Sequence, residues 1–280
     1  MGGKLSGLKN IIWAFAIVLC LVAVLVGLII AAASKYDGEQ ERGAIMLGDT
    51  VNPDGNDGKD GDAEPLPAMV GDGTLHELAE TSDGGQSYID TLTFLCDSTW
   101  LGLRDFGMLS AGSATNQVWG SAAGNIPASS IGSFNIVFPD DGSEISPVDA
   151  AMIVKPKRLV ISLGMDSLAN VTQDGFITNY CALINSIHAV SPDTVIICCA
   201  LSSVTLDYPS IDGLTATMAR DANEWIKQVC IDTGAYYADP AESLRDTSGY
   251  LLTDYSSANG KALNSAALEK ILEYLSTHTA

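Results

Sequence analysis

A serine and two aspartates stand directly after apolar runs of the sequence. Asp97 and Ser98 follow the run 91–96, and Asp166 follows the run 158–164. A serine hydroxyl attacks an ester efficiently only when a neighbouring base takes its proton. An aspartate with its ordinary pKa of about 3.9 is a weak base for this step unless burial raises that pKa. The pattern therefore allows nucleophilic chemistry at Ser98, and it also allows Ser98 and Asp97 simply to cap a helix.

The histidines of the chain offer no obvious base for Ser98. There are three of them, His76, His188 and His278. His76 falls in a segment rich in Gly and Asp, His188 in a predicted helix, and His278 beside the C-terminus. None follows the end of a predicted strand, where a partner of Ser98 would have to stand.

Strands and helices alternate in the C-terminal part of the chain. Apolar runs predict strands at 91–96, 158–164, 194–201 and 235–239, with an extra edge strand at 135–139 that ends at its proline. Amphipathic stretches predict helices at 176–190, 218–233 and 263–278. This alternation indicates an α/β fold with a parallel sheet that is covered by helices on both faces. Ligands bind such sheets outside the carboxyl ends of the strands, where Ser98 and Asp166 are expected.

Four blocks in this order resemble the SGNH or GDSL hydrolases, a family of serine esterases. The blocks are 95–103, 117–125, 163–168 and 259–264. The resemblance implies a flavodoxin-like three-layer sandwich over residues 89–280. It places the nucleophile at Ser98, although Cys96 stands where the family has Gly. It places a backbone donor to the oxyanion at Gly124, with Gly120 as the other option.

Three positions depart from the pattern of the family. Asp166 stands where an Asn side chain would donate to the oxyanion, Asn259 replaces the Asp, and Ala262 replaces the catalytic His. Loss of one triad member costs roughly 10⁴- to 10⁶-fold in kcat. We therefore expect weak or no hydrolysis. The resemblance alone implies the substrate class, acylated cell-envelope glycans or related esters, which the domain would bind or act on. A working acyl hydrolase with a base other than His and a structural interaction module on a stalk are the alternatives.

Two tryptophans and a pair of cysteines leave further alternatives open. Trp100 and Trp119 could stack on a sugar or pack in the core. A disulfide between Cys181 and Cys230 is conceivable outside the cytoplasm, but the sequence does not give the distance between them.

The N-terminal part of the chain predicts a membrane anchor. Residues 11–33 form an uncharged apolar run, which as a helix would span roughly 34 Å, enough to cross a bilayer. Lys4 and Lys9 precede it, and acidic residues follow it. The positive-inside rule then predicts that residues 1–10 are cytoplasmic and that the C-terminal domain is extracytoplasmic on a single-pass membrane protein. A cleaved signal peptide is the rival interpretation.

Composition predicts a spacer and excludes some partners. Residues 34–88 are acidic and rich in Gly and Asp, which predicts a disordered linker. The chain carries 34 Asp and Glu against 14 Lys and Arg, a net charge of −20, which argues against binding to nucleic acid. No motif indicates a cofactor or a metal. The segment 51–62 contains Asp and Gly as calcium-binding loops do, but it lacks the spacing of an EF-hand. The expected partners are therefore the membrane, through residues 11–33, and an acyl ester or glycan.

Overall fold

The computed structural model describes residues 71–257 and 259–280. The predicted membrane helix 11–33 and the predicted linker up to residue 70 lie outside the described residues. Within the described part of the chain, no helix is both long and apolar enough to cross a membrane.

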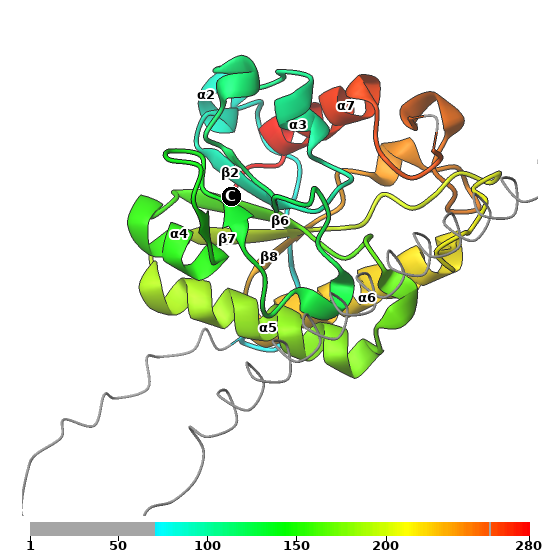
Figure 1. The fold of residues 1–280 in the computed structure, drawn as a ribbon. Coiled ribbons are helices and arrows are strands. Elements are labelled where there is room, and N and C mark those ends of the chain that lie inside the picture. The colour runs from blue at the N-terminus through cyan, green and yellow to red at the C-terminus, as the bar shows by residue number, and fades with distance from the viewer. Residues whose placement is uncertain (1–70, 258) are drawn as a thin grey trace, which may run out of the picture. The chain divides into compact units, whose positions relative to one another are not determined.

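A six-stranded sheet, parallel throughout, forms the centre of the domain (Figure 1). The strands lie in the order β1-β8-β7-β6-β2-β3. Their bounds are β1 His76–Glu77, β2 Leu92–Cys96, β3 Val118–Trp119, β6 Arg158–Ser162, β7 Val195–Cys199 and β8 Tyr236–Ala238. If β1 is set aside, the remaining five strands have the 2-1-3-4-5 order of flavodoxin-like folds. The predicted parallel α/β fold is thus confirmed.

Helices cover both faces of this sheet. The helices α4 (Pro147–Val154), α5 (Gln173–Val190) and α6 (Ala216–Thr233) lie on one face. The helices α2 (Gly85–Ile89), α3 (Gly102–Asp105) and α7 (Ser265–Thr277) lie on the other (Figure 1). Thr172, Thr215 and Asn264 cap the N-termini of α5, α6 and α7 with their side-chain oxygens.

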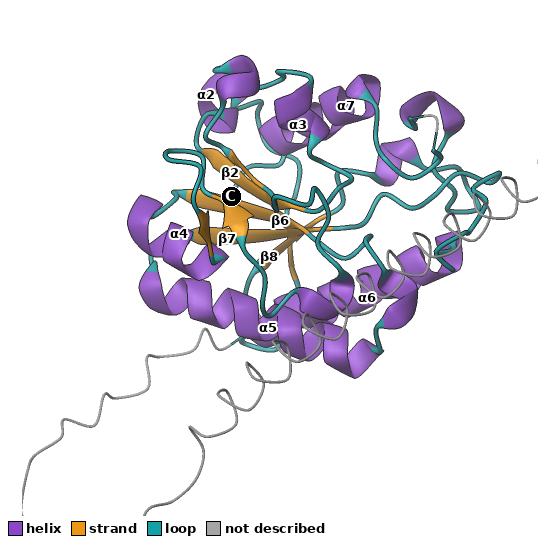
Figure 2. Cartoon of the chain, viewed as in Figure 1, coloured by secondary structure: helices purple, strands orange, loops and turns teal. Residues whose placement is uncertain are grey.

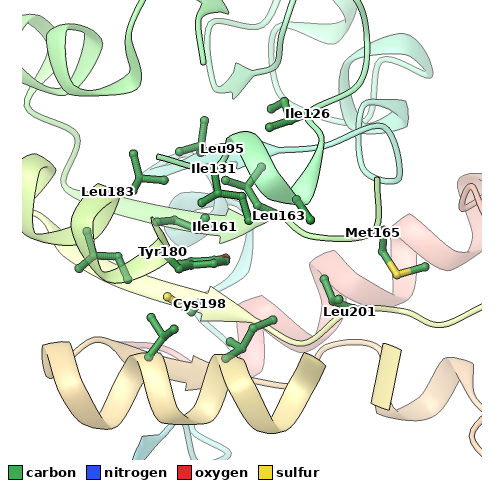
Figure 3. Packing of buried hydrophobic residues seen from close by; sticks show 14 of the residues in the cluster. Leu95, Ile126, Ile131, Ile161, Leu163, Met165, Tyr180, Leu183, Cys198 and Leu201 are labelled. Carbon is green, nitrogen blue, oxygen red and sulfur yellow. The ribbon is translucent and has the colours of Figure 1, made fainter. Parts of the chain in front are cut away.

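The core has two layers because successive strand residues point to opposite faces. Ile161 and Cys198 belong to the layer under α5, where Figure 3 shows Tyr180 lying among them. Val160 and Ile197 belong to the layer under α7. Burial on both faces explains why these strands are apolar without alternation.

The domain begins earlier in the chain than predicted. Part of the predicted linker, residues 71–88, contains β1 and most of α2, and His76 pairs with Tyr236 at the edge of the sheet. Leu78 is buried and its N–H bonds to the carbonyl of Tyr237. A strand of two residues leaves no apolar run in the sequence, which is why composition alone did not indicate it.

The predicted edge strand at 135–139 does not join the sheet. Its residues form β4 (Ile136–Val137), which pairs with β5 (Glu144–Ile145) in a separate antiparallel hairpin. One backbone hydrogen bond of 2.9 Å, from Val137 N to Gly120 O, connects the hairpin to the segment after β3.

Candidate active site at the carboxyl ends of β2 and β6

The candidate site lies where the strand order reverses, between β2 and β6. Such a point opens a crevice at the carboxyl ends of the two strands. Ser98 follows β2 and Asp166 follows β6. Figure 2 shows loops continuing from the ends of β6 and β7 before α5 and α6 begin.

Asp97 joins the loop after β2 to the loop after β6. Its Oδ2 accepts the N–H groups of Gly164 and Met165 at 3.0 and 2.8 Å, while its Oδ1 accepts the N–H and hydroxyl of Thr99. The side chain is buried, and burial followed by the nearby charge of Asp166 raises the pKa of Asp97 to about 6. Because Asp97 accepts hydrogen bonds, among the described residues, only from Thr99 and from the backbone of the loop after β6, its role here is to hold the two loops together.

Ser98 and Asp166 are in direct contact. The hydroxyl of Ser98 donates to Asp166 Oδ1 at 2.6 Å, and the backbone N–H of Ser98 donates to Asp166 Oδ2 at 3.1 Å. Ser98 is half-buried, and Asp166 is only 4% exposed. The sequence prediction that these two residues share one site is consistent with this geometry, and the hydrogen-bond partner of the hydroxyl is a carboxylate rather than an imidazole.

Two further donors converge on the same carboxylate. The N–H of Ile126 donates to Asp166 Oδ2 at 3.0 Å, and Lys261 Nζ lies 3.0 Å from Asp166 Oδ1. These donors come from three separate blocks of the SGNH pattern. Ser98 lies in the first block, Ile126 directly follows the second, and Lys261 lies in the fourth. Asp166 supplies the remaining block, so its carboxylate is the point at which all four meet.

Lys261 is a cation embedded among carboxylates. Its side chain is 15% exposed and its Nζ also lies 3.8 Å from Asp212 Oδ2. Burial lowers the pKa of Lys261, but the charge and hydrogen bond of Asp166, with Asp97 and Asp212, outweigh this and raise it. Lys261 therefore stays protonated and cannot take a proton from Ser98.

Sequence reasoning missed Lys261, although it lies within the fourth block. The position of the family His falls on Ala262, the next residue, and the prediction named Ala262 for that reason. The sequence did contain a signal for this residue. The chain has only 14 Lys and Arg, and Lys261 is one of them, within the block where the family has its charged Asp and His. Only the fold shows that its side chain reaches Asp166.

The predicted glycine and the predicted Asn have structural roles in turns. Gly124 has φ +71° and donates its N–H to the carbonyl of Ser121, so the N–H that points at the site is that of Ile126. The side-chain oxygen of Asn259 accepts the backbone N–H groups of Lys261 and Ala262 at 3.0 and 2.9 Å. Asn259 thereby shapes the loop that carries Lys261 to the site, and Ala262 contributes no ionisable group.

The structure decides between the alternatives for the two tryptophans and for the two cysteines. Trp100 and Trp119 are each 1% exposed, so neither can stack on a sugar in this conformation. Cys181 and Cys230 are free thiols in the structure rather than a disulfide. Within the described residues, no group of three or more His, Cys, Asp or Glu side chains could hold a metal ion.

The donors of the site converge on a carboxylate. Two convergent backbone N–H groups and one further donor are what an oxyanion hole provides to a tetrahedral intermediate. Here the N–H groups of Ser98 and Ile126 both bond to Asp166 Oδ2. The carboxylate of Asp166 thus stands in the place where such an oxyanion would be held.

Comparisons with known proteins give structural likeness at low identity. No protein-family model matches the sequence, and no curated protein matches it. A protein assigned as a platelet activating factor from Streptococcus pneumonia is 15% identical, with a TM-score of 0.48, covering 66% of this chain and 81% of its own. A protein assigned to the G-D-S-L lipolytic family, from Desulfitobacterium hafniense DCB-2, is 16% identical, with a TM-score of 0.47 and coverage of 67% and 98%. A carbohydrate esterase of family 3 from Talaromyces cellulolyticus is 16% identical, with a TM-score of 0.42 and coverage of 64% and 91%.

These comparisons concern the fold and say nothing of substrate. The described domain has a flavodoxin-like strand order, and residues from the four blocks that resemble those of SGNH hydrolases meet at one edge of its sheet.

Proposed function

We propose that this domain binds an acyl ester, such as an acylated glycan of the cell envelope, and turns it over slowly or not at all. The observation that supports the proposal is the carboxylate of Asp166, which engages the Ser98 hydroxyl and both backbone N–H groups of the site. We further propose that residues 11–33 anchor the chain in a membrane with the domain on the extracytoplasmic side.

The carboxylate interferes with two steps of acyl transfer. An oxyanion that formed at Ser98 would meet the negative charge of Asp166 instead of a donor, and loss of one oxyanion donor costs roughly 10²- to 10³-fold in kcat. The donors are also already satisfied, so the carboxylate would have to leave before they could bind substrate. Lys261 opposes that movement because its ammonium group is 3.0 Å from Asp166 Oδ1.

One observation favours the alternative of a working esterase. Asp166 Oδ1 is 2.6 Å from Ser98 Oγ, within the reach that a general base requires. Against it, the oxygens of Asp166 already accept the N–H groups of Ser98 and Ile126 and contact the ammonium group of Lys261, so the carboxylate is held in place by partners other than the Ser98 hydroxyl.

A fluorophosphonate probe distinguishes the two, because it labels only serines that are activated as nucleophiles. We expect no labelling of the wild-type chain and no hydrolysis of p-nitrophenyl acetate above that of Ser98→Ala. Restoring the family residues with Asp166→Asn, Asn259→Asp and Ala262→His together should introduce labelling that again disappears when Ser98→Ala is added. Labelling of the wild type that depends on Ser98 would show that the alternative is correct. Calorimetry with acetylated oligosaccharides then tests binding. For the triple variant, Asp166→Asn alone is the matched control, because it restores the family Asn without introducing a His.

A further inference from the structure

A cavity lies at the same edge of the sheet, on the far side of β6 from Ser98. It has a volume of about 250 Å³ and is formed by the segments after β7 and β8 together with one side of α6. Ser203, at its wall, has φ +80°, a left-handed conformation that non-glycine residues seldom adopt. None of the residues of the Ser98 site is among those that form this cavity.

The charges around the cavity are unusual for this domain. Residues 71–280 contain 9 Lys and Arg against 25 Asp and Glu. Three of the nine cations, Arg220, Lys227 and Arg245, line this one cavity. Two carboxylates, Glu224 and Asp239, line it as well. The lining therefore presents both signs of charge, with positive charge in excess, inside a strongly acidic domain.

The cations keep donors that are not used within the protein. Arg245 donates to the carbonyl of Leu201 at 3.0 Å and forms an ion pair with Asp239, which accounts for two of its five N–H groups. Arg220 has its nearest carboxylate partner, Asp221, at 3.9 Å and is largely exposed. Lys227 pairs with Glu224 at 2.8 Å.

One carboxylate oxygen of Asp239 lacks a donor in the described part of the chain. Asp239 Oδ2 is paired with Arg245, whereas Asp239 Oδ1 is buried and has no hydrogen-bond partner among the described residues. A buried acceptor without a donor is costly and uncommon in folded proteins. Asp239 is therefore held by Arg245 through one oxygen only.

The geometry points to a binding site for a small zwitterion that carries a carboxylate and an ammonium group, such as a free amino acid. Guanidinium groups bind carboxylates through paired N–H donors, and Arg220 with Arg245 supplies them. Glu224 and Asp239 line the cavity and supply the negative charge that an ammonium group requires. The volume of 250 Å³ is below the roughly 300–1,000 Å³ of pockets for drug-sized ligands, which suits a molecule of this size.

Binding measurements on the full chain test this directly. Chemical-shift changes would be followed on addition of alanine, acetate, methylammonium and inorganic phosphate, each up to 50 mM. We expect alanine to bind more tightly than either single-charge analogue and to shift resonances of Arg220, Glu224 and Asp239. Equal binding of acetate or phosphate would overturn the zwitterion, and the absence of binding by all four probes would overturn the site.

A matched pair of lysine variants shows whether binding occurs in this cavity. Lys227 pairs with Glu224 and Lys270 pairs with Glu273 in the same i, i+3 arrangement, at 2.8 and 2.7 Å. Lys227→Gln and Arg220→Gln should each weaken alanine binding about tenfold or more, because each removes a charge-assisted donor. Lys270→Gln, on α7, should leave it unchanged. If Lys270→Gln has the same effect as Lys227→Gln, the ligand does not bind in this cavity.

Discussion

At the residue scale, Asp97 makes the stability of the fold depend on pH, and the structure gives the direction of that dependence. Burial raises the pKa of Asp97 to about 6 in the folded protein, against about 3.9 in an unfolded chain. Between these values the folded state binds the proton more tightly, so the free energy of unfolding falls as pH rises from about 4 to about 6. A difference of two pKa units corresponds to about 3 kcal/mol at most.

Asp97→Asn removes the ionisable group and with it this dependence. The variant is expected to be less stable than the wild type, because an amide cannot accept all the hydrogen bonds that Asp97 accepts. The difference in unfolding free energy should be largest near pH 4 and shrink toward pH 6, as measured by urea unfolding. Asp141→Asn is the control of opposite sign: hydrogen bonds from Ser143 lower the pKa of Asp141, so its contribution is lost as pH falls. A pH-independent difference for Asp97→Asn would contradict the assignment.

At the scale of elements, the loop before α7 depends on a close approach at Gly260. Gly260 has φ +76°, and a Cβ added there would lie 2.7 Å from Thr205 Oγ1. The N–H of Thr205 also bonds to the carbonyl of Gly260 at 2.9 Å. This loop carries Lys261 to Asp166, so its position matters for the site.

Gly260→Ala should therefore destabilise the protein through two effects, backbone strain and a steric clash. The two together should lower the unfolding free energy by about 2–4 kcal/mol. Gly142→Ala isolates the strain, because Gly142 has φ +75° but nothing within 4 Å of an added Cβ. Adding Thr205→Ala to Gly260→Ala should recover part of the excess over Gly142→Ala, because Tyr208 Cδ2 also lies 3.2 Å from the added Cβ. Equal losses for the two glycine variants in urea unfolding would mean that the clash has no effect on stability.

The sequence predicts those elements that are long and apolar. β2, β6 and β7 each bury five or nearly five residues, which leaves a continuous run, and α5 and α6 each span 18 residues with capping threonines. β1 and β3 have two residues each and are defined by their pairing with β8 and β2, which no local pattern encodes. The site divides in the same way: Ser98 and Asp166 follow long strands, whereas Lys261 reaches Asp166 across 95 residues of sequence.

At the scale of the whole molecule, the charge and the apolar run predict how the chain is arranged about a membrane. The described domain is acidic, which disfavours its adsorption to anionic lipid. Attachment would then depend on residues 11–33, with Lys4 and Lys9 on the cytoplasmic side. If the run spans the bilayer, alkaline carbonate should leave the chain in the membrane pellet. Protease added to intact cells should cleave the acidic segment 34–70.

Two arginines at the middle of this run should abolish anchoring. An arginine at the centre of a membrane helix costs about 2.5–3.5 kcal/mol, so Val22→Arg with Leu25→Arg should move the chain out of the carbonate-resistant fraction. Val22→Ala with Leu25→Ala keeps the run apolar and should leave the chain in the pellet. A cleaved signal peptide predicts another outcome: a wild-type chain in the soluble fraction whose N-terminal sequence begins near Ser34. That result would refute the anchor, while the proposals for Ser98 and for the zwitterion cavity would stand unchanged.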